Sequence, residues 1–206
     1  MSEKLLGTLS KGLLIVISAP AGTGKTTLVR MLTDEFSCVS ESISCTTRPI
    51  RQKEIADKDY HFLSEEEFKK KVVEGKFLEH AEVFGNYYGT LRSHIDEKLG
   101  EKKHVILVID TQGAMDLKEK EVDGVYIFVR PPSLAELRQR LFKRASDKPE
   151  EIENRLTWAK NEIEMSRHYD YTILNDNLHR AYEILRSILI AEEHKKERYD
   201  ERILDE

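Results

Sequence analysis

The residues best suited to chemistry form a glycine-rich turn that ends in Gly24, Lys25 and Thr26. In such a turn, backbone N–H groups curl around phosphate oxygens, the lysine reaches the terminal phosphates and the threonine hydroxyl can ligate Mg²⁺. An apolar run precedes the turn and an amphipathic segment follows it, so a helix would point its positive end at the anion. This order predicts a site for a nucleoside triphosphate with Mg²⁺. The residues expected to contact this nucleotide, which the resemblance given below implies is ATP, are Ala19, Pro20, Ala21, Gly22, Thr23, Gly24, Lys25, Thr26 and Thr27.

One position departs from the G-x-x-x-x-G-K-[ST] pattern, because Ala19 stands where the first glycine is expected. Alanine is the smallest substitute, so the turn stays intact unless this residue requires a positive φ. The competing interpretation is a chance glycine-rich turn after a buried strand. The order of strand, turn and helix favours the phosphate-binding loop.

A second group of residues suits a phosphate dianion. Arg48 and Arg51 offer two planar guanidinium forks, and Tyr60 and Tyr88 offer neutral hydroxyl donors. The competing interpretation is a solvated loop whose tyrosines support a small sheet. A phosphate loop in the same chain favours a second phosphate site.

The elements that position these residues follow a strand–helix rhythm. Uninterrupted apolar runs at 13–18, 104–109, 124–129 and 171–174 predict a parallel sheet covered on both faces. A helix is expected after the phosphate loop, and another from a capping box at Ser133 to about Arg144. The next helix begins near Asp147, and the last extends from Leu178 to Glu192. The residues that the helix from Asp147 is expected to bury are Ile152, Leu156, Ala159 and Ile163. The charged tail 192–206 and the lead-in 1–11 are predicted to be frayed or flexible.

Residues 40–90 break this rhythm. Short β-like pieces at 42–45, 59–62, 77–83 and 87–90 surround one helix, which a capping box at Ser64 and Glu67 opens. Ligands of parallel sheets bind beyond the carboxyl ends of the strands, where an insertion can close over them. We therefore predict an inserted mixed α+β subdomain that faces the phosphate loop.

Composition limits the classes of protein. The 206 residues suffice for one large domain or for a core with one inserted subdomain, and 39% hydrophobic with 34% charged residues is typical of a soluble globular protein. A net charge of −5 argues against broad binding to nucleic acid. Cys38 and Cys45 form no disulfide framework and are expected in a reducing cytoplasm. No segment reads as a signal peptide or membrane span.

Further motifs carry a family resemblance. Residues 44–51 read SCTTRPIR, 59–62 read DYHF, 77–79 read FLE and 85–89 read GNYYG. With the phosphate loop, and in this order and spacing, they closely resemble the guanylate kinase family from about residue 12 to residue 186. The resemblance implies an α/β P-loop NTPase fold with a parallel core (12–39, 91–132 and 167–206), a GMP-binding insertion (40–90) and a helical lid (133–166). It also implies Mg²⁺-dependent transfer of a phosphoryl group from ATP to GMP, giving ADP and GDP.

The resemblance also assigns the acceptor site. Glu79 would accept two hydrogen bonds, from N1–H and the exocyclic amine of guanine, where adenine offers an unprotonated N1. Such pairing can discriminate between bases by a factor of about 10⁴. Ser44 and Thr90 match hydroxyl positions that contact the base. The residues that the resemblance assigns to the GMP phosphate are Arg48, Arg51, Tyr60 and Tyr88.

Asp110 has three competing interpretations. It ends the predicted strand 104–109, where P-loop enzymes place an acidic residue near Mg²⁺. The resemblance places it mainly on the GMP side, and it can also cap the helix that follows. The family often has a second acidic residue two positions earlier, where this chain has Val108, which weakens a two-carboxylate metal site.

Arginines of the predicted lid match those that close over ATP in the family. They are Arg140, Arg144 and Arg155, and in the family pattern they neutralise charge during phosphoryl transfer. Arginines on helices are commonly just solvated, and the turn 143–147 has fewer glycines than the family pattern. Asn175 matches an asparagine near adenine, with helix capping as the alternative. No histidine is expected as a general base, because a GMP phosphate oxygen is already an anionic nucleophile.

Three functional hypotheses remain. The first is a cytoplasmic guanylate kinase, monomeric or homodimeric, that takes ATP and GMP and binds neither nucleic acid nor membrane. The second is a non-catalytic guanylate-kinase-like module that binds phosphorylated protein segments; the complete Gly24, Lys25 and Thr26 argue against it. The third is a kinase for another nucleoside or sugar phosphate, against which Glu79 argues.

Overall fold

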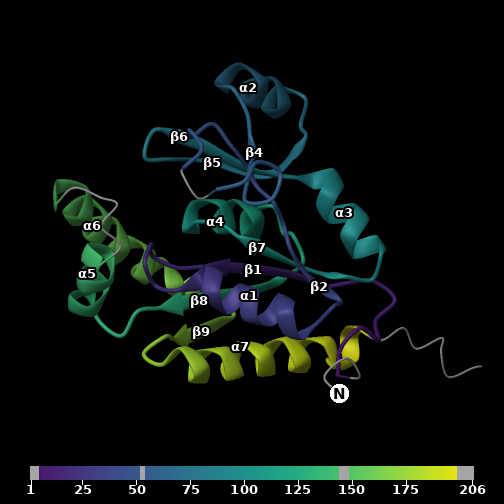
Figure 1. Ribbon diagram of the computed structural model, residues 1–206. Helices are drawn as coiled ribbons and strands as arrows, with labels where there is room; N and C mark the ends of the chain where they lie inside the picture. Colours follow the sequence, from purple (N-terminus) through teal and green to yellow (C-terminus); the bar gives the residue numbers. More distant parts are fainter. Residues whose placement is uncertain (1–4, 52–53, 144–148, 199–206) are drawn as a thin grey trace, which may run out of the picture.

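A computed structural model of the chain describes residues 5–51, 54–143 and 149–198 (Figure 1). Its main sheet has five parallel strands in the order β2-β7-β1-β8-β9. β1 (Leu14–Ser18) is buried throughout and lies between β7 (His104–Val108) and β8 (Val125–Arg130). β2 (Val39–Glu41) and β9 (Tyr171–Leu174) form the edges. The predicted parallel α/β core is confirmed.

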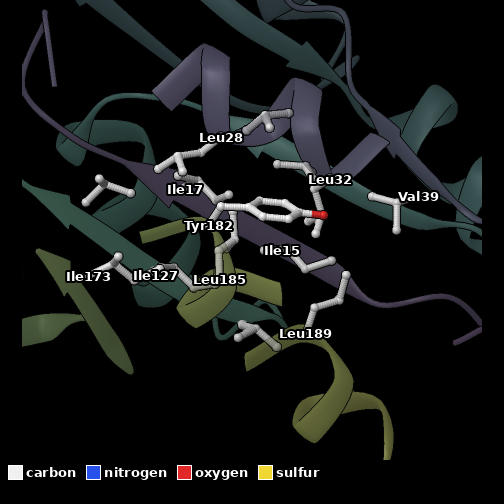
Figure 2. Close-up of a cluster of buried hydrophobic side chains, with 14 of the residues drawn as sticks. Ile15, Ile17, Leu28, Leu32, Val39, Ile127, Ile173, Tyr182, Leu185 and Leu189 are labelled. Atoms are coloured by element: carbon white, nitrogen blue, oxygen red, sulfur yellow. The ribbon is translucent and has the colours of Figure 1, made fainter. Parts of the chain in front are cut away.

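Helices cover both faces of this sheet, which is why its strands read as continuous apolar runs. α1 (Lys25–Glu35) and α7 (Leu178–Glu193) pack on one face. Figure 2 shows Leu28 of α1 and Tyr182 and Leu185 of α7 gathered with Ile15 and Ile17 of β1. α3 (Arg92–Gly100) and α4 (Thr111–Glu119) pack on the other face.

The insertion folds as a second, mixed sheet in the order β4-β3-β6-β5. Its strands are β3 (Cys45–Thr46), β4 (His61–Phe62), β5 (Phe77–Val83) and β6 (Asn86–Leu91), and β3 pairs parallel with β4 but antiparallel with β6. Phe68 of α2 (Glu65–Val73) stacks on Phe77 with a ring centroid distance of 4.5 Å. Ser64 and Glu67 form the predicted capping box. This small aromatic core fixes α2 on the sheet.

The predicted strand at 42–45 is wrong in its bounds. Residues 39–41 instead form β2, which pairs with β7 in the main sheet, and residues 45–46 form β3 in the small sheet. Within β2 only Val39 is buried, so this short edge strand has no apolar run for sequence analysis to detect. The chain therefore leaves the main sheet after Glu41.

Two helices of the predicted lid pack on each other. α5 (Leu134–Lys143) and α6 (Pro149–Met165) share an apolar cluster of Leu137, Leu141, Ile152, Leu156 and Ala159. Ser133 Oγ accepts the N–H of Glu136 at 3.1 Å, as its capping motif predicts. Arg144 and the turn to residue 148 lie outside the described residues. Ile163, expected in the core, is only half-buried, and Glu162 is buried beside it.

Residues 5–9 and the end of α7 pack together, although the sequence predicted flexible or frayed segments there. Leu6 and Leu9 belong to the core. The buried Glu193 carboxylate accepts Gly7 N–H at 2.9 Å, Thr8 N–H at 2.8 Å and His104 Nε2–H at 2.6 Å. Leu13 N–H donates to His104 Nδ1 at 3.1 Å, so this imidazole is the neutral Nε2–H tautomer. The prediction failed because charged residues here are satisfied by groups distant in sequence.

Glu193→Ala is expected to lower the free energy of unfolding by about 3 kcal/mol, because several buried donors lose their acceptor. Urea denaturation measures this loss. Glu183→Ala, on the exposed side of the same helix, is the matched control and is expected to change stability by less than about 0.5 kcal/mol. Equal effects of the two substitutions would contradict the structural role of Glu193.

Candidate active site

A cavity of about 440 Å³ lies between the phosphate loop, the insertion and the end of β7. It brings together eleven of the residues predicted from the sequence, drawn from segments far apart in the chain. Polar and charged groups therefore meet at the carboxyl edge of the main sheet, where ligands of such folds bind. Those eleven residues are Ala21, Lys25, Thr26, Ser44, Arg48, Arg51, Tyr60, Glu79, Tyr88, Asp110 and Arg155.

Two glycines give the phosphate loop its curvature. Gly22 and Gly24 have φ angles of 87° and 101°, which side chains other than glycine rarely adopt. Ala19 is buried and is not among the residues with positive φ. Alanine in place of glycine therefore causes no backbone strain at this position. The Lys25 ammonium donates to the Ala19 carbonyl across the loop. The loop thus carries its own lysine folded back over the anion site.

Asn175 stabilises this loop from behind. Its buried side chain donates Nδ2–H to the Thr23 carbonyl at 2.7 Å. The alternative role as a helix cap is wrong, because Asn177 accepts Arg180 N–H and caps α7. The observed partner of Asn175 is therefore the loop backbone.

Glu79 is the carboxylate at the floor of the cavity. It is 3% exposed, and Thr90 donates to its Oε1 at 2.6 Å. Burial raises the pKa of Glu79 to about 7, although the Thr90 hydrogen bond opposes the shift and the nearby Asp110 carboxylate adds to it. An acceptor held this far from water is well placed to read hydrogen-bond donors of a ligand.

Gly113 makes room for Glu79, and the sequence analysis missed it. A Cβ added at this position of α4 would lie 2.5 Å from Glu79 Oε2. The absence of a side chain lets the carboxylate approach the first turn of the helix, whose positive end stabilises a negative charge. A glycine inside a predicted helix was the available sequence signal.

Asp110 caps the same helix. Its Oδ1 accepts Gly113 N–H at 2.9 Å, and its Oδ2 accepts from Gln112 Nε2 at 3.1 Å. The capping interpretation is thus confirmed, and the residue also lines the cavity. One carboxylate serves both the helix and the site.

The arginine cluster contains a carboxylate that the sequence analysis missed. Glu54 accepts two hydrogen bonds from the Arg48 guanidinium, at 3.0 and 2.8 Å, and one from Arg51 N–H at 2.9 Å. Arg48 also stacks over the Tyr60 ring at 5.3 Å, and the Tyr60 and Tyr88 rings meet edge to face. These contacts fix the plane of the Arg48 guanidinium group. The spacing of three residues between Arg48, Arg51 and Glu54 was the available signal.

The two predicted lid arginines that the structure describes lie in different surroundings. Arg155 lines the cavity and lies over the Phe84 ring at 5.7 Å. Arg140 instead pairs with Glu136 at 3.1 Å and donates to the Asn175 carbonyl at 3.2 Å. The third, Arg144, lies outside the described residues. Of the two described arginines, Arg155 is the one positioned to reach a ligand in this conformation.

Glu162 of α6 is a further buried carboxylate, and the sequence analysis missed it. It is 6% exposed, and burial raises its pKa to about 7, a shift that the positive charge of Lys25 opposes and the negative charge of Asp110 increases. Its position in the helix follows the buried Leu156 and Ala159 at core spacing. The available sequence signal was its spacing of three residues from Ala159, which was predicted to be buried.

Other expectations concern metals, thiols and membranes. Within the described ranges, no three His, Cys, Asp or Glu side chains cluster in a way that could hold a metal ion. Cys38 and Cys45 are not joined in a disulfide. Among the helices of the described residues, none is both long and apolar enough to cross a membrane.

Comparison with known proteins identifies the family. A guanylate kinase family model matches residues 11–192. The chain is 51% identical over 185 residues to the guanylate kinase of Protochlamydia amoebophila, covering 90% of this chain and 93% of that one. It is 46% identical over 196 residues to that of Clostridium perfringens, covering 95% and 91%. A crystal structure of guanylate kinase from Anaplasma phagocytophilum superposes with a TM-score of 0.76 at 36% identity, covering 92% of this chain and 90% of that one. The chain belongs to the guanylate kinase family.

Proposed function

We propose that this guanylate kinase transfers the γ-phosphoryl group of ATP to GMP within the cavity described above, giving ADP and GDP. One observation carries the assignment of the site. The same cavity is lined by the lysine of the phosphate loop and by Glu79, a nearly inaccessible carboxylate suited to reading a guanine edge. A donor site and an acceptor site therefore share one space.

On the donor side, the phosphate loop binds ATP. Gly22 and Gly24 let the backbone N–H groups face the phosphates, and the Lys25 ammonium moves from the Ala19 carbonyl to the terminal phosphates. Asn175 contributes indirectly by bonding the loop backbone. The remaining residues assigned to ATP are Pro20, Ala21, Thr23, Thr26 and Thr27.

The donor set at the loop also fits Mg²⁺, which prefers oxygen ligands. Thr26 and Asp110 line the same cavity as Lys25. Thr26 would hold the ion directly, and Asp110, which already caps α4, is the second candidate. When bound, Mg²⁺ would neutralise the charge that develops on the phosphates.

On the acceptor side, Glu79 accepts hydrogen bonds from the guanine edge. The Thr90 hydroxyl already fixes the orientation of this carboxylate, and Ser44 lies at the rim of the same cavity. The GMP phosphate binds Arg48, whose guanidinium plane Glu54 holds. Arg51, Tyr60 and Tyr88 complete this phosphate site.

Phosphoryl transfer needs positioning and charge neutralisation more than covalent help. Arg155 reaches the cavity, and we assign it to the transferring group together with Arg140 and Arg144, which approach when the lid closes. We assign residues 40–90 to GMP binding, 133–166 to the lid, and 12–39, 91–132 and 167–206 to the core. Closure over ATP excludes water and limits wasteful hydrolysis.

The free thiols Cys38 and Cys45 support a cytoplasmic location. The substrates are ATP and GMP, with no nucleic acid or membrane partner, and the protein acts as a monomer or homodimer. The alternative, a non-catalytic phosphopeptide-binding module, does not need the complete phosphate loop that this chain keeps.

The proposed function is tested by ADP formation from ATP and Mg²⁺ with GMP, AMP, UMP or dTMP as acceptor. GMP is expected to give turnover, with kcat/KM above that of AMP by a factor of about 10⁴, because AMP leaves Glu79 unpaired. An absence of GMP-dependent turnover would exclude the enzyme assignment. Equal use of AMP would exclude the role of Glu79.

Glu79→Gln is expected to lower kcat/KM for GMP by about 100-fold, since hydrogen bonds to a charged acceptor are lost, while ATP affinity stays within threefold. Steady-state kinetics with each substrate varied in turn provide the measurement. Glu82→Gln, on the exposed side of the same strand, is the control. Because the pKa of Glu79 is about 7 in the free protein, the wild-type advantage over Glu79→Gln shrinks as the pH falls below 7. A ratio independent of pH would contradict this reading.

Lys25→Ala is expected to reduce turnover at least 100-fold and to leave the dissociation constant for GMP within threefold. The ammonium serves the transferring phosphoryl group, whereas GMP binds through the insertion. Initial rates and calorimetric titration with GMP measure the two effects. Loss of GMP binding in this variant would show that donor and acceptor sites are not separate.

A further inference from the structure

The lid helices pack against the phosphate loop. The cluster that joins α5 and α6 also packs against Ala21 of the loop, and a Cβ added at Gly22 would lie 3.1 Å from Leu141. Glu162 follows Ala159 of this cluster by three residues and is 6% exposed. The predicted lid helix therefore carries a buried carboxylate on the face that packs inward and not toward solvent.

Two charged groups from other elements act on this carboxylate. Lys25 is the first residue of α1, and Asp110 caps α4. Lys25 attracts the Glu162 charge, whereas Asp110 repels it. The charge of Glu162 thus acts on the lysine of the phosphate loop.

The fold gains nothing evident from this carboxylate. Among the hydrogen bonds and ion pairs of the described residues, none involves Glu162. A largely buried carboxylate without hydrogen-bond donors destabilises the folded state. The Tyr169 hydroxyl is also buried, which raises its pKa; interaction with Ser18 opposes this shift, and the negative charges of Asp110 and Glu162 add to it. Polar groups kept at such a cost beside a ligand site indicate a functional reason.

We propose that Glu162 is a positioning residue for phosphoryl transfer that acts through Lys25. Without nucleotide, the Lys25 ammonium binds the Ala19 carbonyl, and it must leave this oxygen to reach the transferring group. The Glu162 carboxylate attracts the ammonium and so limits where it moves. Because Glu162 belongs to α6, the placement of Lys25 also depends on the placement of the lid. This inference rests on the role proposed for Lys25.

The test compares Glu162→Gln with Glu164→Gln, which removes an exposed carboxylate from the same helix. Glutamine keeps the shape of Glu162 and removes its charge. We expect kcat to fall about tenfold, with KM for ATP and for GMP within twofold of wild type. The midpoint of thermal unfolding is expected to be unchanged or higher, because a desolvated charge is gone. Glu164→Gln is expected to match wild type in all four quantities.

Glu162→Asp separates charge from shape. It keeps the carboxylate but shortens the side chain, so it is expected to retain more kcat than Glu162→Gln. A kcat of Glu162→Gln within twofold of Glu164→Gln would overturn the inference. A lowered thermal midpoint together with a raised KM for ATP would also overturn it, since it would mark a structural role in the lid. A kcat of Glu162→Asp below that of Glu162→Gln would overturn the inference as well.

The failure of this inference is distinguishable from failure of the proposed function. If wild type shows no GMP-dependent turnover, the function itself fails. If wild type turns over, Lys25→Ala does not, and Glu162→Gln matches wild type, only the role of Glu162 fails.

Discussion

The site depends on the parallel pairing of β1 with its neighbours. Ile15 is in register with Ile106 of β7 and Val125 of β8, so these strands end at the same edge of the sheet. The phosphate loop, Asp110 and Asn175 follow from the strand ends at this edge. Asn175 then bonds the loop backbone across 152 positions of sequence. Because β1 is buried on both faces, the loop begins from a rigid support, and the glycines that follow provide its curvature.

Positively and negatively charged side chains lie close together in the cavity. On the proposed function it binds two phosphate groups, which Lys25, Arg48 and Arg51 favour, yet it also contains the buried Glu79 carboxylate and the half-buried Asp110 carboxylate. Glu79 is neutralised in part by its raised pKa, and Gly113 lets it approach a helix N-terminus. Stability alone would replace such groups with apolar residues. Their retention is consistent with a protein that sits above a stability threshold and uses the excess for recognition.

Local sequence patterns predicted much of this arrangement. They did not predict the residues whose role depends on partners distant in the sequence. The phosphate loop, β5 and the Ser64 cap depend on residues adjacent in sequence. Glu54 and Glu162 look like ordinary surface residues in the sequence, because their roles depend on interactions with Arg48 and Lys25. Glu193 was assigned to a frayed tail for the same reason, since its donor Gly7 lies 186 positions away. Single-sequence periodicity carries no information on such contacts.

The donor and acceptor halves connect to the core through different contacts. The acceptor sheet meets the core where β5 packs on α4, with Glu79 against Gly113. The lid helices meet it at the loop, through Leu141 beside Gly22 and through Arg140, which donates to the Asn175 carbonyl. On the proposed function, a change in loop conformation on binding ATP would therefore act directly on α5 and α6, whereas GMP would act through α4.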